Sequence, residues 1–103
     1  SVELSRLFYS VIKGIVKTTL QVKELSDRYF EECRKENLHF VTTEDCEIAA
    51  AATLAGVKSL ITENRKTLNN PKVKEAFQRV NSKRNLKELK IQDCKSFMEE
   101  IYV

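Results

Sequence analysis

Acidic and amide side chains border two neighbouring segments of this 103-residue chain. Glu44, Asp45 and Glu47 stand at the start of an alanine-rich run, and Glu63 and Asn64 follow the apolar run that comes after it. Carboxylate and amide oxygens are the ligands that Mg²⁺ and Mn²⁺ prefer, and converging carboxylates repel one another unless a cation lies between them. Such an ion can bind a phosphate and lower the pKa of an attacking water. The first chemistry that these residues suggest is metal-assisted hydrolysis of a phosphate ester.

Simple geometry brings the two acidic segments to one edge of the domain. A helix over residues 45–55 advances roughly 16 Å, and a strand over residues 57–62 returns roughly 20 Å. Asp45 and the Glu63/Asn64 pair therefore end on the same side. A second interpretation stays open, because acids in the first turn of a helix are favourable simply through the helix dipole and the unpaired N–H groups.

Other chemistries find less support in the sequence. His39 is the single histidine and has no cysteine or second histidine at ligand spacing, so a structural or surface role is the simpler interpretation. With only Gly14 and Gly56, no phosphate-binding glycine loop is expected, which disfavours nucleotide-dependent phosphoryl transfer and hydride transfer. The three cysteines are odd in number and widely spaced, which favours reduced thiols in a cytoplasmic protein. No apolar run approaches the roughly eighteen residues that a membrane span needs.

Basic residues are concentrated in the second half of the chain. Between Val57 and Lys90, ten Lys or Arg residues stand against three Glu, a net charge of +7 in a chain whose total is +3. This asymmetry would attract a polyanion such as RNA, although a solvated basic face explains it equally well. The candidate nucleic-acid contacts are Lys58, Arg65, Lys66, Lys83 and Arg84.

The apolar pattern predicts the elements that would position these side chains. Helical spacing over residues 4–37 indicates two long helices, or one bent helix that breaks at Thr18 or at Ser26–Asp27. Short apolar stretches predict strands at 38–41, 57–62 and 86–91. Capping residues predict the three later helices: Thr43 to Gly56, one beginning at Asn70-Pro71, and one beginning at Asp93.

The order strand, helix, strand, helix, strand, helix from residue 38 onward is typical of an α/β fold. It predicts one domain over residues 1–103, with a parallel sheet of about three strands covered by helices. In such sheets, functional groups lie at the carboxyl ends of the strands. Both acidic segments follow predicted strands and fall on that edge.

Two motifs resemble those of PIN-domain nucleases. DCEIAAAA, from Asp45, resembles the D-x-x-I-A-A helix start of that family, and LITEN, nineteen residues later, resembles its strand ending in T-x-D. The resemblance covers residues 38–92. It implies a small PIN-like α/β domain that cuts RNA with Mg²⁺ or Mn²⁺, of the toxin or RNA-processing type, with an antitoxin protein as a potential partner.

The resemblance also implies catalytic and metal-binding residues. Asp45 would be the family's third acid, Asn64 with Glu63 beside it takes the place of the usual Asp, and Glu3 would be the second acid. The family's first, central strand, which ends in Asp-Thr-Asn, has no counterpart here, and some forty residues would be missing from the front. Since an exposed strand edge invites association, we expect a truncated domain that forms a homo-oligomer and has weak or no activity.

Two alternatives to a nuclease remain at this point. A non-catalytic domain would use its basic second half to contact RNA or an acidic partner. A protein-interaction module would instead use the first two helices to pack against its partner.

Overall fold

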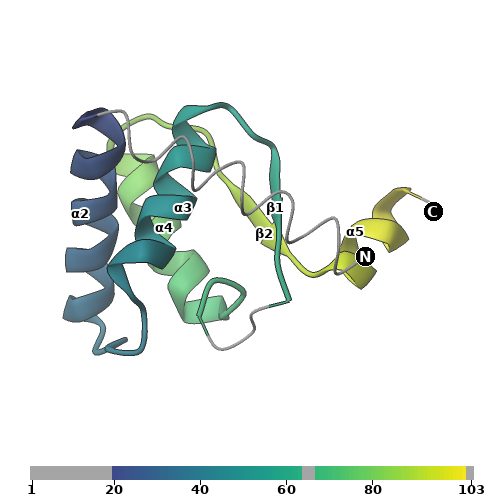
Figure 1. Cartoon of the computed structure of the whole chain (residues 1–103), viewed down its shortest axis with the longest axis horizontal. Coiled ribbons are helices and arrows are strands. Elements are labelled where there is room, and N and C mark those ends of the chain that lie inside the picture. The colour runs from purple at the N-terminus through teal and green to yellow at the C-terminus, as the bar shows by residue number, and fades with distance from the viewer. Residues whose placement is uncertain (1–19, 64–66, 102–103) are drawn as a thin grey trace.

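The structure, a computed structural model, describes residues 20–63 and 67–101. Helices α2 (Leu20–Lys35), α3 (Thr43–Leu54) and α4 (Pro71–Lys83) lie on one side of a small sheet. The sheet consists of β1 (Ser59–Ile61) and β2 (Lys90–Gln92), and α5 (Cys94–Ile101) projects away from the helices (Figure 1). The fold is mixed α/β and mostly helical. None of these helices is long and apolar enough to cross a membrane.

The two strands are parallel, as the alternation of elements predicts. Leu60 is paired with Ile91, and α4 carries the chain from the end of β1 back to the start of β2. The backbone amides of Lys90 and Thr62 extend the ladder by bonding to Lys58 and Gln92. Both strands are shorter than predicted, but they lie within or overlap the predicted segments 57–62 and 86–91.

The predicted strand at residues 38–41 is wrong. This segment is a turn between α2 and α3, in which the amide of Val41 donates to the carbonyl of Leu38 at 3.3 Å. Leu38 and Val41 are nevertheless buried, at 6% and 4% exposure. The apolar pattern therefore reflects two side chains that anchor a turn in the core, and the sheet has two strands within the described residues instead of about three.

Three helices end in the same way. After α2, α3 and α4 the chain enters the left-handed region at Asn37, Gly56 and Asn85, with φ of 60°, 75° and 56°. At the end of α3, the amide of Val57 bonds to Ala52 and that of Gly56 to Thr53, which satisfies carbonyls that have no partner within the helix. The predicted role of Gly56 is confirmed, since glycine adopts positive φ without steric cost.

The N-cap of α3 lies one residue before the predicted N-cap, Thr43. Thr42, rather than Thr43, is the N-cap, with extended backbone. The caps of the later helices are as predicted: Asn70 caps α4 with Pro71 in its first turn, and Asp93 accepts a hydrogen bond from the amide of Ser96 in α5. Helix α2 is continuous through Ser26–Asp27, which excludes a break there, whereas Thr18 lies outside the described residues.

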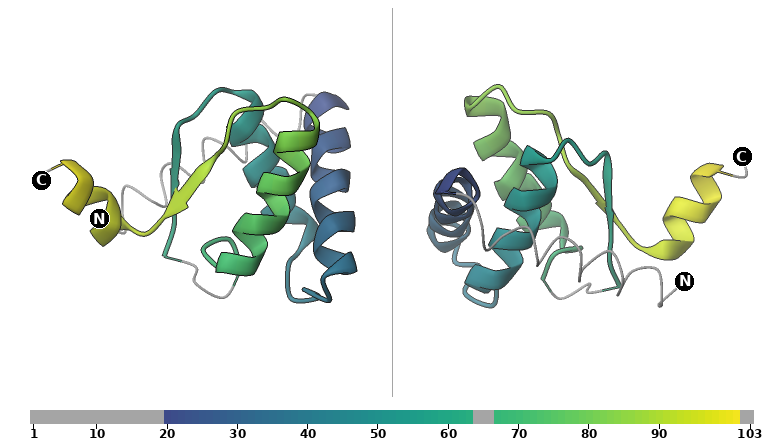
Figure 2. Two further views of the ribbon diagram at one scale, coloured as in Figure 1. Left: turned by 180° about the vertical axis from the view of Figure 1, so that it is seen from behind. Right: turned by 45° about the horizontal axis from the view of Figure 1, so that its top comes forward.

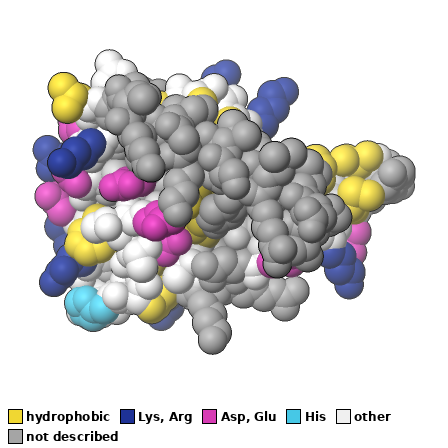
Figure 3. Space-filling view, in the orientation of Figure 1, with side chains coloured by type: hydrophobic (Ala, Val, Ile, Leu, Met, Phe, Trp, Pro, Cys, Tyr) yellow, Lys and Arg dark blue, Asp and Glu magenta, His cyan; other side chains and the backbone are white. Residues whose placement is uncertain are grey.

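The core lies between α2, α3, α4 and the sheet. The alanine run 49–52 is buried throughout, which lets α3 pack closely against its neighbours, and the rings of Tyr29 and Phe77 stack with centroids 4.4 Å apart. Helix α5, by contrast, buries none of its residues. Met98 and Ile101 are 41% and 55% exposed, and hydrophobic side chains are visible on this projecting end in Figure 3.

Candidate functional site

The start of α3 and the end of β1 lie at the same end of the molecule. Figures 1 and 2 show this arrangement from three directions, with the turn before α3 and the segment after β1 both at the lower end in Figure 1. It arises because α3 and β1 run in opposite directions on either side of Gly56. We call this end, which carries Asp45 and Glu63, the carboxylate edge.

Asp45 is held by the first turn of its own helix. Its Oδ2 accepts a hydrogen bond from the Thr42 amide at 3.2 Å, while its own amide donates to Thr42 Oγ1 at 3.1 Å. This reciprocal pair is a capping box. Oδ1 of Asp45 accepts no hydrogen bond from the described part of the chain.

Glu63 connects the end of β1 to the start of α5. Its Oε1 accepts a hydrogen bond from the Cys94 amide at 3.0 Å, so the carboxylate occupies the positive end of a short helix. The side chain is exposed, and its Oε2 has no hydrogen-bond partner among residues 20–63 and 67–101. Glu63, like Asp45, makes one structural contact and has one oxygen that no described residue bonds to.

The other predicted ligands, Asn64 and Glu3, lie outside the described residues. Within those that are described, no group of three or more His, Cys, Asp or Glu side chains could hold a metal ion. The described residues by themselves do not form a complete site.

The predicted nucleic-acid contacts are not gathered around the carboxylate edge. Lys58 precedes β1, and Lys83 and Arg84 stand at the end of α4. Because α4 runs back from the end of β1 to the start of β2, all three lie toward the opposite end of the molecule, which we call the basic end (Figure 1). Arg65 and Lys66 lie outside the described residues.

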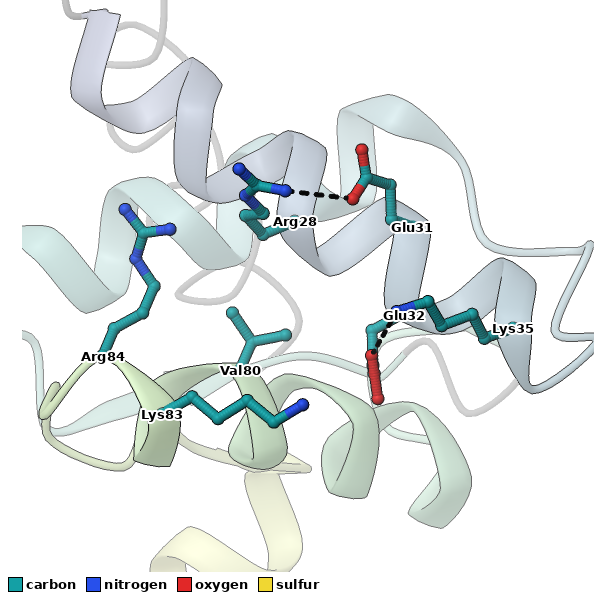
Figure 4. Close-up of a pocket in the computed structure, with 7 residues that line it drawn as sticks. All are labelled: Arg28, Glu31, Glu32, Lys35, Val80, Lys83 and Arg84. Atoms are coloured by element: carbon teal, nitrogen blue, oxygen red, sulfur yellow. Dashed lines mark hydrogen bonds and ion pairs between the residues drawn. The ribbon is translucent and has the colours of Figure 1, made fainter.

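Between α2 and α4 lies a shallow groove of about 230 Å³, which extends from the basic end toward the last turn of α2. Arg28 and Arg84 extend from the two helices on either side of it (Figure 4). It is lined by Arg28, Glu31, Glu32, Lys35, Val80, Lys83 and Arg84. Most of its cations are engaged with acids: Arg84 bonds to Glu24 at 2.6 Å and holds the pKa of that carboxyl below its ordinary value.

Two lysines near the carboxylate edge were not predicted from the sequence as nucleic-acid contacts. Lys72 lies in the first turn of α4 and Lys95 in the first turn of α5, and both are exposed. Helix α5 begins two residues after the end of β2, and α4 follows β1 after a nine-residue connection. The parallel topology alone could have identified them, because the first turn of a helix that follows a strand lies at the strand's carboxyl end.

Comparisons with known proteins do not identify a family for this chain. No protein-family model, curated protein or solved structure matches the chain.

Proposed function

We propose that this chain is a PIN-like domain for divalent-metal-dependent cleavage of RNA, with Asp45 and Glu63 as metal ligands at the carboxylate edge. The observation that carries the proposal is that the start of α3, which bears Asp45, and the segment after β1, which bears Glu63, lie at one end of the molecule (Figure 1). Each carboxylate has one oxygen without a hydrogen-bond partner among the described residues. Asn64 and Glu3 complete the ligand set by resemblance. Mg²⁺ or Mn²⁺ bound there would supply charge for binding a phosphodiester and activating water.

Self-association and weak activity are parts of the same proposal. Within the described residues, β1 and β2 pair only with each other, so each has one edge without a described partner. An open edge is a template for pairing with another chain. A homo-oligomer that fills the sheet in this way would bring a second set of carboxylates into one assembly, and a single copy would cleave RNA weakly or not at all. Light scattering on the purified chain measures its mass directly.

The test uses substitutions that remove charge and keep each hydrogen bond. Asp45→Asn retains an acceptor for the Thr42 amide, and Glu63→Gln retains one for the Cys94 amide. Mn²⁺ binding is measured by titration, alongside cleavage of labelled single-stranded RNA. We expect each variant to bind Mn²⁺ at least about tenfold more weakly than the unaltered chain. Glu99→Gln, on the exposed part of α5, is the matched control.

Equal Mn²⁺ affinity of all four proteins would contradict the metal site, whatever the activity. Absence of cleavage by this chain and by a version extended upstream of Ser1 would contradict the nuclease function.

A non-catalytic RNA-binding domain is the second candidate, and the placement of the basic residues favours it. Lys58, Lys83 and Arg84 lie away from the carboxylate edge, as expected if RNA binds without being cut there. This alternative predicts salt-sensitive RNA binding that survives Asp45→Asn and weakens on Lys83→Ala, whereas the nuclease proposal predicts metal-dependent binding near Lys72 and Lys95. RNA affinity at several salt concentrations separates the two.

A further inference from the structure

A second groove, of about 340 Å³, lies between α4 and β2. Helix α4 runs alongside β2 on the side away from β1 (Figure 2, left). One wall of the groove is the segment from Glu88 to Gln92, together with Ser96 of α5. The other wall is one face of α4, which contributes Lys74, Phe77, Gln78 and Asn81. This groove shares no lining residue with the groove between α2 and α4.

The edge of β2 that faces this groove has backbone groups without partners. Lys90 and Gln92 bond toward β1 through their backbone groups. Because the direction of these groups alternates along a strand, those of Ile91 and Leu89 point away from β1. The amide of Ile91 and both backbone groups of Leu89 have no hydrogen-bond partner in the described part of the chain. Both residues are buried, at 4% and 9% exposure, and buried backbone groups are normally paired.

Lys74 places a positive charge at one end of this edge. Its Nζ donates to the carbonyl of Ile91 at 3.2 Å and to Oδ1 of Asn69 at 3.0 Å, in a partly buried position. An ammonium group has three donors, so one remains. Lys74 forms no ion pair with a described carboxylate, although a buried charge is normally paired. The charge and the spare donor favour an anionic group as the ligand.

We propose that this groove binds the C-terminal segment of a peptide, as a third strand parallel to β2 whose terminal carboxylate pairs with Lys74. An extended peptide supplies the groups that the edge of β2 lacks, and addition of a strand to an open sheet edge is a common way to bind one. A residue opposite Lys90 would donate its amide to the Leu89 carbonyl and accept from the Ile91 amide, as in a parallel ladder.

The position of Lys74 sets the direction and the length of the peptide. Because Lys74 occupies the Ile91 carbonyl, the next bond of the ladder is closed, and the peptide ends there with its carboxylate beside the ammonium group. From Lys74 to Asn81 the wall of α4 extends roughly 10 Å at about 1.5 Å per residue, which matches about three residues of extended peptide.

The walls also indicate the composition of the peptide. Phe77, Leu89 and Ile91 line the groove and favour apolar residues at the end of the peptide. Glu88, which is exposed, also lines the groove and disfavours further acidic residues. The partner is therefore a chain that ends in apolar residues and has a free carboxylate. The site needs no metal at the carboxylate edge and is independent of the nuclease proposal.

The probe is a pool of acetylated tetrapeptides whose last three positions are varied and whose C-terminus is free. A second pool has the same sequences with an amidated C-terminus. Both pools are passed over the immobilised chain in EDTA, and mass spectrometry identifies the peptides retained. We expect peptides with a free carboxylate and apolar last residues to be retained. Their amidated counterparts should bind at least about tenfold more weakly, because they lack the charge that pairs with Lys74.

A retained peptide is then titrated against the unaltered chain in solution, and hydrogen exchange is followed by NMR. Exchange of the Ile91 amide should slow by at least about tenfold, because the peptide carbonyl becomes its acceptor. Exchange of the Leu60 amide, in β1, should stay unchanged. Lys74→Met keeps the apolar part of the side chain and should weaken binding by at least about tenfold. Lys23→Met, on the exposed side of α2, is the matched control and should bind as the unaltered chain does.

The comparison of free and amidated peptides uses the unaltered chain, so it decides the matter even if Lys74→Met folds poorly. Retention of neither pool, or equal retention of both, would overturn the proposal. So would a retained peptide that protects amides elsewhere in the molecule and leaves the Ile91 amide unprotected.

Discussion

In the layer formed by α2, α3 and α4, the hydroxyl of Tyr29 donates to Asn81 at 2.5 Å and lies 3.0 Å from the hydroxyl of Thr53. At the carboxylate edge, Asp45 and Glu63 instead accept hydrogen bonds from two backbone amides, those of Thr42 and Cys94. The first group joins three helices and is buried. The second group is partly or wholly exposed, and each carboxylate keeps one oxygen without a described partner.

The difference separates residues that hold the fold together from residues that can bind a ligand. A buried polar group must be fully satisfied by the protein, because an unpaired one loses its hydrogen bonds to water. An exposed carboxylate can give one oxygen to a helix cap and keep the other for a cation. Substitutions in the helical layer should therefore change stability strongly, and those at the carboxylate edge should change it little.

The largest effect is expected from Tyr29→Ala. Tyr29 is fully buried and stacks on Phe77, so truncation leaves a large cavity and unpaired polar atoms. We expect the free energy of unfolding to fall by about 4 kcal/mol, a large part of the total for a domain of this size. Urea unfolding followed by circular dichroism measures it. A loss below about 1 kcal/mol would show that the layer is not the stabilising region.

Tyr29→Phe should lower the free energy of unfolding by about 2 kcal/mol at neutral pH, because Asn81 Oδ1 loses its buried hydrogen-bond donor. Burial raises the pKa of Tyr29 from 10.0 to about 12, so the neutral hydroxyl favours the folded state. The contribution of the Tyr29 hydroxyl to the free energy of unfolding is fully present below about pH 10 and is lost as the pH rises through about 12.

The stability difference between the unaltered chain and Tyr29→Phe should therefore shrink between these two pH values. Thermal unfolding of both proteins from pH 7 to pH 12 provides the measurement. A constant difference across this range would contradict the predicted linkage.

Asp45→Ala should lower the free energy of unfolding by a smaller amount, about 1 kcal/mol, because it removes one half of the capping box. Asp45→Asn should lower it by only about a few tenths of a kcal/mol, since the side-chain amide oxygen can still accept a hydrogen bond from the Thr42 amide. The contrast between these two variants in urea unfolding separates the cap from the charge. Equal losses would mean that the charge, and not the hydrogen bond, supports the start of α3.

The smallest effect is expected from Glu63→Ala. This side chain is exposed, so the global free energy of unfolding should change by no more than about 0.5 kcal/mol. The effect should be local, because the Cys94 amide loses its acceptor at the start of α5. Hydrogen exchange of that amide should become faster while amides in α2 and α3 stay unchanged. Faster exchange throughout the molecule would contradict the separation of the two regions.

Local signals in the sequence predicted much of the fold. Gly56 ends α3, Asn70 with Pro71 begins α4, and the alternation of elements gave the parallel pairing of the two strands. These features depend on interactions within a few residues or on the simple geometry of helices and strands. The shared end of Asp45 and Glu63 was predictable for the same reason.

Other features could not be predicted because they depend on which elements pack together. Leu38 and Val41 have the composition of a strand, yet they anchor a turn, because short apolar stretches are compatible with several buried conformations. The capping role of Glu63 requires α5, which begins 31 residues later along the chain. Lys83 and Arg84 belong to a basic segment of the sequence, but the direction of α4 carries them away from the carboxylate edge.

The sequence by itself determined where the helices begin and end and which side of the domain bears the acids, because caps, glycine and helical spacing act locally. Only the tertiary structure decided that Tyr29 joins Asn81 to Thr53, and that Glu63 accepts a hydrogen bond from the Cys94 amide at the start of α5. Contacts of this kind depend on the packing of α2 against α3 and α4, which burial of the whole core selects and no single segment encodes.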